Sequence, residues 1–254
     1  MRTFALPMSR FFIQIKYRGT NYHGWQLQPN ANSVQAEINK ALSTLFQEDI
    51  NVTGAGRTDT GVHAQEFFAH FDTQQLFDLK KYCFKLNCML PQDIACVELQ
   101  KVPSDLHARF SASKRTYEYW ITPQKNPFLM DGAYFFHHPL NVNAMNAAAQ
   151  MLIRKADFSC FSKSNTDTFT NDCHITQASW ELKNDLLVFT ISSDRFLRNM
   201  VRAIVGTLLE VGLGKVEVTE MENIIASKDR SKAGSSVPAH GLYLTNIKYP
   251  DNGC

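Results

Sequence analysis

Several features that would mark a particular class of protein are missing from this chain of 254 residues. No apolar run approaches the ~20 residues that a membrane-spanning helix needs, and no signal peptide is recognisable, so we expect a cytoplasmic protein. The six cysteines form no C-x-x-C pair and no Cys/His cluster with zinc-ligand spacing, which predicts free thiols and no metal site. Phosphate-binding and dinucleotide-binding glycine motifs are absent too, so any chemistry must run on side chains.

The chain also lacks a large excess of positive or negative charge, because its formal net charge is only +2. Charged residues at 20% and hydrophobic residues at 44% are ordinary for a globular chain long enough for one large domain or two small ones. A net charge this small is compatible with a nucleic-acid partner but does not by itself predict one. If the protein binds RNA, its basic residues must be concentrated on one side.

Apolar periodicity predicts an alternation of strands and helices. Ser33 is the expected N-cap of the first helix, and Asn184-Asp185 is the expected turn of a hairpin. The expected strands are 11–17, 65–71, 94–102, 115–122, 175–182, 186–192 and 242–249, and the expected helices are 34–45, 80–90, 142–153, 196–211 and 217–226.

The order strand, helix, strand, strand, helix, strand occurs roughly twice in this prediction. It indicates an α/β (α+β) protein with two similar domains, each a mostly antiparallel sheet backed by helices. The boundary is expected between Val102 and Ser113, which gives domains at 8–105 and 106–250.

The segment 54–64, G-A-G-R-T-D-T-G-V-H-A, is the most informative motif. Its three glycines allow a sharp turn and the close approach of a ligand. Arg57 stands two residues before Asp59 and favours the ionised carboxylate. The combination suits an aspartate that acts as a nucleophile or as a fixed negative charge.

Two other interpretations of this segment stay open on the residues alone. It can be a tight turn with a surface ion pair, since structural ion pairs also perturb carboxylates. Asp59-Thr60-Gly61 also spells the triplet of aspartic proteases, which need two such aspartates sharing one proton. The chain holds no second triplet, so a protease would have to be a homodimer, and Arg57 would oppose the shared proton.

Two basic regions follow in the second half. Arg195, Arg198 and Arg202 have the spacing of one helix face, which favours an anion site for RNA phosphate or for the Asp59 carboxylate. The segment 111–120 interleaves Lys114 and Arg115 with three aromatic residues. On a strand, two of them, Tyr117 and Tyr119, share one face and the third, Trp120, takes the other, as in a surface on which a base stacks.

Several ordered motifs together resemble the tRNA pseudouridine synthase A family over nearly the whole chain. They begin with Y-R-G-T at 17–20, G-W-Q at 24–26 and S-V-Q at 33–35. Residues 56–64 are similar to the family's catalytic motif, with Asp59 on the nucleophile and Thr60 where the family usually has Ala. Later matches are 107–112 with 115–117, 157–161, 196–202 with Gly206, and 241–244.

The resemblance implies isomerisation of uridine to pseudouridine at positions 38–40 of the tRNA anticodon arm, by a homodimer without metal or organic cofactor. Asp59 would either attack the sugar C1′ or assist glycal formation. Arg57 and Arg202 would keep it ionised. Tyr117 matches the tyrosine that would stack on the base, and Leu242 matches the leucine that lines the uracil pocket.

The resemblance also implies ferredoxin- or RRM-like halves that form a central cleft. An RNA-binding or RNA-folding protein without turnover is the alternative. The remaining basic residues are candidate phosphate contacts, which position RNA without reading bases: Arg109, Lys114, Arg115, Arg195, Arg198, Lys228, Arg230 and Lys232.

Overall fold

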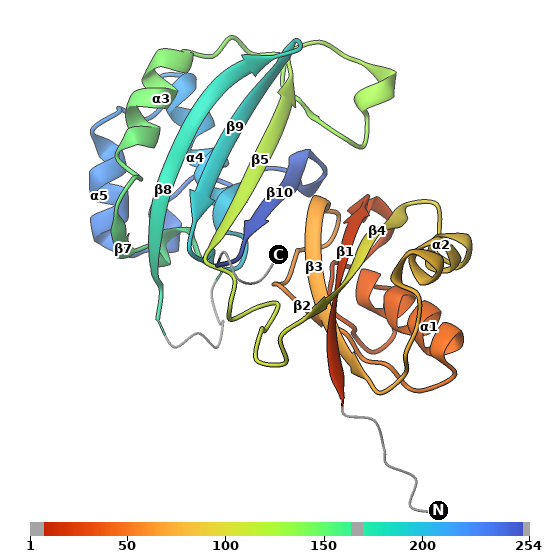
Figure 1. Ribbon diagram of the computed structural model, residues 1–254. Coiled ribbons are helices and arrows are strands. Elements are labelled where there is room, and N and C mark those ends of the chain that lie inside the picture. The colour runs from red at the N-terminus through yellow and green to blue at the C-terminus, as the bar shows by residue number, and fades with distance from the viewer. Residues whose placement is uncertain (1–7, 164–169, 251–254) are drawn as a thin grey trace, which may run out of the picture. The chain divides into compact units, whose positions relative to one another are not determined.

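The structure is a computed structural model that describes residues 8–163 and 170–250 (Figure 1). The chain divides into two compact units. The first contains the described residues up to Ser113 and those from Leu244 onward, and the second is Lys114–Tyr243. This division differs from the predicted 8–105 and 106–250, because the boundary falls later and the last strand returns to the first unit. Both units combine strands and helices, which confirms the predicted α+β class.

The first unit is a sheet with two helices on one side (Figure 1). β1 is its middle strand and pairs antiparallel with β3 and β4, while the short β2 pairs with β3. Helices α1 and α2 pack against each other, and α2 packs against β4. The elements are β1 (Ser9–Tyr17), α1 (Val34–Phe46), β2 (Thr53–Gly54), β3 (His63–Thr73), α2 (Leu79–Met89) and β4 (Ile94–Val102).

Alternation along β1 builds the core of this unit. Phe11, Ile13 and Ile15 share one face of the strand and are at most 6% exposed. The ring of Phe71 on β3 lies 5.7 Å from that of Phe11 and 5.7 Å from that of Phe46 on α1, so α1 packs on this face. Burying each such side chain contributes roughly 2–3 kcal/mol, which fixes the helix on the sheet.

The predicted start of α1 is confirmed. Ser33 has extended backbone, and its side chain accepts a hydrogen bond from Ala36 N at 3.3 Å. Val34, Ile38, Ala41 and Leu42 recur at helical spacing and are buried, and Leu45 is half-buried. The N-cap therefore satisfies a helix-end donor where the apolar face begins.

The second unit holds the strand order β5-β9-β8-β7, antiparallel throughout, with β6 added in parallel to β5. Helices α3, α4 and α5 lie on one side of this sheet (Figure 1). The elements are β5 (Lys114–Thr122), β6 (Tyr134–Phe135), α3 (Val142–Gln150), β7 (Lys155–Asp157), β8 (Asp172–Lys183), β9 (Leu186–Ser193), α4 (Met200–Gly212), α5 (Glu220–Ser227) and β10 (Leu242–Lys248), whose last residues belong to the first unit.

The hairpin predicted at 184–185 is confirmed. Asn184 and Asp185 have φ values of +48° and +64°, and they join β8 to β9. Positive φ at both central residues is the signature of a type I′ turn, whose twist matches that of the flanking strands.

The helix predicted from residue 196 was placed too early. α4 begins at Met200, because Asn199 has the left-handed φ of +65° and stops helical hydrogen bonding before it. Arg195 and Arg198 therefore lie in an irregular segment and do not share a helix face with Arg202, which corrects that prediction. The apolar pattern misled because Leu197 is buried, at 5% exposure, without being helical.

The described cysteines are free thiols, as predicted, and Cys254 lies outside the described residues. Over the described ranges, no helix has the length and apolar character that crossing a bilayer requires. The same residues hold no group of three or more His, Cys, Asp or Glu side chains arranged to bind a metal ion.

Candidate active site

The Asp59 loop, residues 54–64, leaves the sheet of the first unit at β2 and rejoins it at β3. Ala55 N donates to Phe68 O at 2.8 Å. At Gly54 a Cβ atom would lie 2.5 Å from the indole of Trp25, so only glycine lets this ring cover the start of the loop. The loop thus begins on a packed aromatic surface.

The turn itself is made by Asp59-Thr60-Gly61. Gly61 has φ of +79°, which favours glycine, and Val62 N donates to Asp59 O at 3.1 Å across the turn. The Asp59 side chain is half-buried, whereas Thr58 just before it is buried. The protease triplet is thus accounted for as a turn that presents Asp59.

Arg57 takes a different place from the one that the sequence predicts. Its side chain is exposed, and among the described residues none of the ion pairs joins it to Asp59. A Cβ at the neighbouring Gly56 would meet no atom within 4 Å. The surface beside Arg57 is therefore open, so the residue is accessible to a ligand and does not form the surface ion pair with Asp59.

Three of the predicted residues, Tyr117, Arg202 and Leu242, lie in the second unit. Tyr117 on β5 is half-buried, and its ring packs edge-on against that of Phe196, with centroids 5.2 Å apart. Tyr119, two residues further on the same strand face, is fully buried. The prediction that both tyrosines stand on one face agrees with the strand geometry, but only Tyr117 keeps accessible ring surface.

Arg202 lies in the first turn of α4, and both its backbone and its side chain form hydrogen bonds with Val237. Its Nε donates to Val237 O at 2.8 Å, and its own carbonyl accepts from Val237 N at 3.2 Å. A Cβ at Gly206, one turn later, would lie 1.8 Å from Ser235 O, so α4 and the 235–237 segment are in backbone contact. These contacts hold the guanidinium at one end of the helix.

Tyr119 ties β5 to the same segment. Its hydroxyl donates to Pro238 O at 2.7 Å, next to the carbonyl that Arg202 binds. Burial raises the pKa of Tyr119, while the nearby Arg202 charge lowers it, and the group stays a protonated donor. Leu242, buried at 5% exposure, opens β10 four residues later. The segment 235–242 therefore contains Leu242 and binds the side chains of Arg202 and Tyr119.

The candidate phosphate contacts differ in exposure. Arg109, Arg198, Lys228 and Lys232 are exposed, whereas Lys114, Arg115, Arg195 and Arg230 are half-buried. Several are bound within the protein: Arg109 lies over the Phe110 ring at 5.6 Å, Arg115 donates to Asp194 O at 2.7 Å, Lys228 pairs with Asp157 at 3.2 Å, and Arg230 donates to Ala233 O and Ser236 Oγ at 3.1 Å each.

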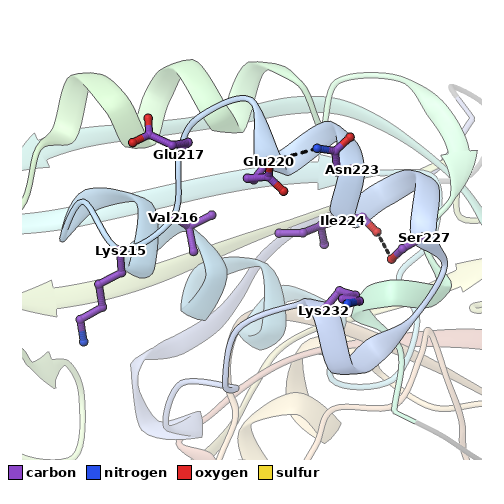
Figure 2. Close-up of a pocket in the computed structure, with 8 residues that line it drawn as sticks. All are labelled: Lys215, Val216, Glu217, Glu220, Asn223, Ile224, Ser227 and Lys232. Carbon is purple, nitrogen blue, oxygen red and sulfur yellow. Dashed lines mark hydrogen bonds between the residues drawn. The ribbon is translucent and has the colours of Figure 1, made fainter.

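Two open cavities of about 470 and 480 Å³ lie in the second unit, and neither contains a predicted catalytic or uridine-binding residue. Figure 2 shows the first, where Glu220 and Asn223 are hydrogen-bonded on α5 and Lys215 and Lys232 stand at the sides. Two lysines and two glutamates line this cavity, so its charge favours a ligand of neither sign. Neither cavity adds a residue to those predicted for catalysis or for uridine binding.

Sequence reasoning missed several residues that build these regions. Tyr17, Gly24 and Trp25 were noticed only as a resemblance, yet they touch the Asp59 loop directly. Val237 and Pro238 carried no signal at all, because what they contribute is backbone carbonyls. Every residue type has a backbone carbonyl, so a residue that acts through this group cannot be recognised from its identity in the sequence.

Comparison with known proteins agrees with these motifs. The sequence model of a family described as tRNA pseudouridine synthase matches residues 13–111 and 148–250. A tRNA pseudouridine synthase A of Bacteroides thetaiotaomicron is 50% identical over 248 residues, covering 96% of this chain and 92% of the relative. That of Porphyromonas gingivalis is 49% identical over 249 residues, covering 96% and 99%. That of Acetivibrio thermocellus is 42% identical over 237 residues, covering 92% and 97%. The chain therefore belongs to the tRNA pseudouridine synthase A family.

Proposed function

We propose that this protein isomerises uridine to pseudouridine in tRNA, at positions 38–40 of the anticodon arm, with Asp59 as the nucleophile. The observation that carries the proposal is the setting of Asp59. It is a half-buried carboxylate at the tip of a glycine turn whose backbone is hydrogen-bonded, beside open space at Gly56. A carboxylate held in this way suits attack on a bound carbon centre.

The reaction needs no external reductant, oxidant or group donor. The N1–C1′ bond breaks, the uracil turns, C5 bonds to C1′, and the C5 proton is lost while N1 gains a proton. Asp59 serves this sequence either by displacing N1 from C1′ and leaving again when C5 bonds there, or by taking a sugar proton on a glycal route and returning it once C5 has bonded. Both routes use the ionised carboxylate.

The second unit contributes the groups that hold the uridine. The accessible ring of Tyr117 stacks on the base, and its hydroxyl relays the proton from C5. The Arg202 guanidinium keeps a negative charge ionised and oriented, and Leu242 excludes water so that the cleaved uracil is recaptured. The exposed Arg57 binds the substrate. The target uridine must leave the stack, which costs roughly a few kcal/mol.

We further propose that the protein acts as a homodimer in the cytoplasm, where tRNA is available, and that one tRNA touches both subunits. The exposed Arg109 and Arg198 are the strongest candidates for phosphate contacts, with Lys114 and Arg115 beside Tyr117 on the chain. Because net charge is only +2, affinity depends on where these cations stand. Binding is expected to weaken with salt.

The test is to incubate unmodified tRNA transcripts with the purified protein and to map pseudouridine in the anticodon arm. We expect product at positions 38–40 with the natural protein and none with Asp59→Asn, which keeps the side-chain shape and removes the nucleophilic charge. Asp49→Asn is the matched control, because it makes the same carboxylate-to-carboxamide change at an exposed position of the same unit. Tight tRNA binding without product in every variant would favour the non-catalytic RNA-binding protein.

A further inference from the structure

The opening loop, residues 17–25, is bound to the backbone on both sides of Asp59. Trp25 N donates to Thr58 O at 3.2 Å, and Gly61 N donates to Tyr22 O at 3.3 Å. The Thr58–Asp59 peptide group and the Thr60–Gly61 peptide group are therefore tied to the same neighbouring segment. Backbone hydrogen bonds of this kind limit how far the turn can rotate.

A second contact ties the opening loop to the residues that follow the turn. Gly19 N donates to Nδ1 of His63, a residue only 1% exposed, at 3.0 Å. A Cβ at Gly19 would lie 2.0 Å from Val62 O, so the two backbones are in direct contact. The contact requires that no side chain stands between them.

Gly24 lies against the backbone of Thr58 and Asp59. A Cβ at this position would lie 2.4 Å from Thr58 O and 3.2 Å from the Asp59 carbonyl carbon. Gly24 also has φ of +93°, a conformation that favours glycine. A side chain here would have to displace the peptide that carries the carboxylate.

A pair of hydroxyl groups forms a further contact between the opening loop and the residue before Asp59. Tyr17 Oη and Thr58 Oγ1 lie 2.9 Å apart, both in buried residues, and either can donate the hydrogen bond. The Tyr17 ring is fixed against Phe67 and Trp25, with centroids 5.8 and 6.4 Å away. The hydroxyl therefore meets Thr58 from a rigid position.

The opening loop is anchored on its far side as well. Tyr22 Oη donates to Asp93 Oδ1, Asn21 Nδ2 donates to Asp93 Oδ2 at 2.9 Å, and Arg18 N donates to Asp93 O at 2.9 Å. Burial raises the pKa of Tyr22, and the bond to Asp93 raises it further, so this donor stays protonated. A segment held at both sides can transmit rigidity to its neighbour.

We propose that the opening loop is a brace that gives the Asp59 carboxylate one orientation, and that Tyr17 and Gly24 are positioning residues for it. The inference rests on the proposed function, in which Asp59 is the nucleophile. Neither residue needs to touch the substrate. Each acts by holding the Thr58–Asp59 peptide, because the reacting carboxylate projects directly from it.

The test compares kcat and KM on unmodified tRNA. Tyr17→Phe deletes one hydroxyl and is expected to lower kcat by roughly tenfold with KM unchanged, because misplacing a reacting group raises the barrier and not the binding free energy. Thr58→Val should do the same, whereas Thr58→Ser, which keeps the hydroxyl, should restore kcat. Gly24→Ala should have the largest effect of the set.

Two matched controls separate positioning from general loss of stability. Tyr249→Phe removes a hydroxyl that donates to Ala108 O at 2.6 Å in the same unit, away from the Asp59 loop along the chain. Gly214→Ala imposes a similar backbone cost, at φ of +70°, where a Cβ would meet no atom within 4 Å. Both controls should keep the natural kcat.

Hydrogen–deuterium exchange supplies a readout that does not depend on turnover. Amides of residues 58–63 should exchange faster in Tyr17→Phe than in Tyr249→Phe. If Tyr17→Phe and Thr58→Val alter neither kcat nor this exchange more than Tyr249→Phe does, the brace is overturned. If Asp59→Asn keeps full activity, the proposed function fails, and the exchange result still decides whether the brace exists.

Discussion

The Asp59 loop and the Arg202 region solve the same problem, holding one charged group still, by different means. Asp59 sits in an irregular turn whose backbone is bound by a second irregular segment. Arg202 sits on a buried helix whose backbone contacts the 235–237 segment. We expect loss of the loop contact to misplace its group with a small loss of folding free energy, whereas loss of the helix contact should weaken the core of its unit as well.

Among the variants that test the difference between the two regions, Gly206→Ala should have the largest effect. Its Cβ would lie 1.8 Å from Ser235 O, so α4 and the 235–237 segment must separate. We expect a loss of roughly 3 kcal/mol in the free energy of unfolding, from overpacking against rigid backbone. Denaturant unfolding measures it, and hydrogen exchange should show the loosening in the second unit. Equal loosening at the Asp59 loop would break the distinction.

Arg202→Lys is expected to be next. Lysine keeps the charge but lacks the planar guanidinium, so while it donates to Val237 O it cannot present further donors in the direction of the two terminal guanidinium nitrogens. We expect kcat/KM for tRNA to fall by about 100-fold, equivalent to about 2.7 kcal/mol. Unfolding should be affected far less than in Gly206→Ala. Natural kcat/KM in this variant would show that charge alone suffices at this position.

Acid should weaken the first unit before the second. His70, 6% exposed, accepts from Ala108 N at 3.2 Å, and burial lowers its pKa from 6.5 to about 4. The unfolded chain therefore takes up a proton first, so stability is complete above pH 6.5 and falls as pH drops toward about 4, by roughly 1.4 kcal/mol per pH unit. The pKa of His107 is lowered by burial as well, which acts in the same direction.

Unfolding at pH 7, 6 and 5 checks this expectation, with His70→Gln as the comparison variant. The glutamine does not titrate, so its stability should depend less on pH over this interval. An unchanged pH dependence in His70→Gln would assign the acid sensitivity to other groups.

The smallest effect is expected on RNA binding. Arg198 is exposed, whereas Arg230 donates to Ala233 O and Ser236 Oγ. Arg198→Ala should weaken tRNA affinity a few-fold and reduce the slope of log K against log salt by about 1, as for one lost phosphate contact. Arg230→Ala should lower unfolding stability and leave the slope unchanged. Binding titrations at several salt concentrations distinguish the two, and equal slopes would contradict the assignment.

Much of the local structure followed from local pattern. The cap at Ser33, the turn at 184–185 and the strand at 94–102 were predicted because each depends on residues near it in the chain. The start of α4 could not be predicted, because burial of Leu197 imitates helical periodicity in a segment that Asn199 keeps irregular. The surface ion pair that the sequence left open as an alternative is not among the ion pairs of the described residues, because a spacing of two residues does not set side-chain direction in a turn.

The sequence was enough to identify the family and to nominate the residues that we propose for the chemistry: the Asp59 carboxylate, Arg57 and Arg202, and Tyr117 on its strand. What holds these residues in place became visible only in the folded chain, because many of the groups that contact them are glycine Cα atoms, carbonyl oxygens and side chains from segments distant in the sequence. Gly24 lies against the Thr58–Asp59 peptide, and Arg202 bonds to Val237 O, at separations that no local pattern encodes. Packing of distant segments sets such contacts, and side-chain identity alone does not.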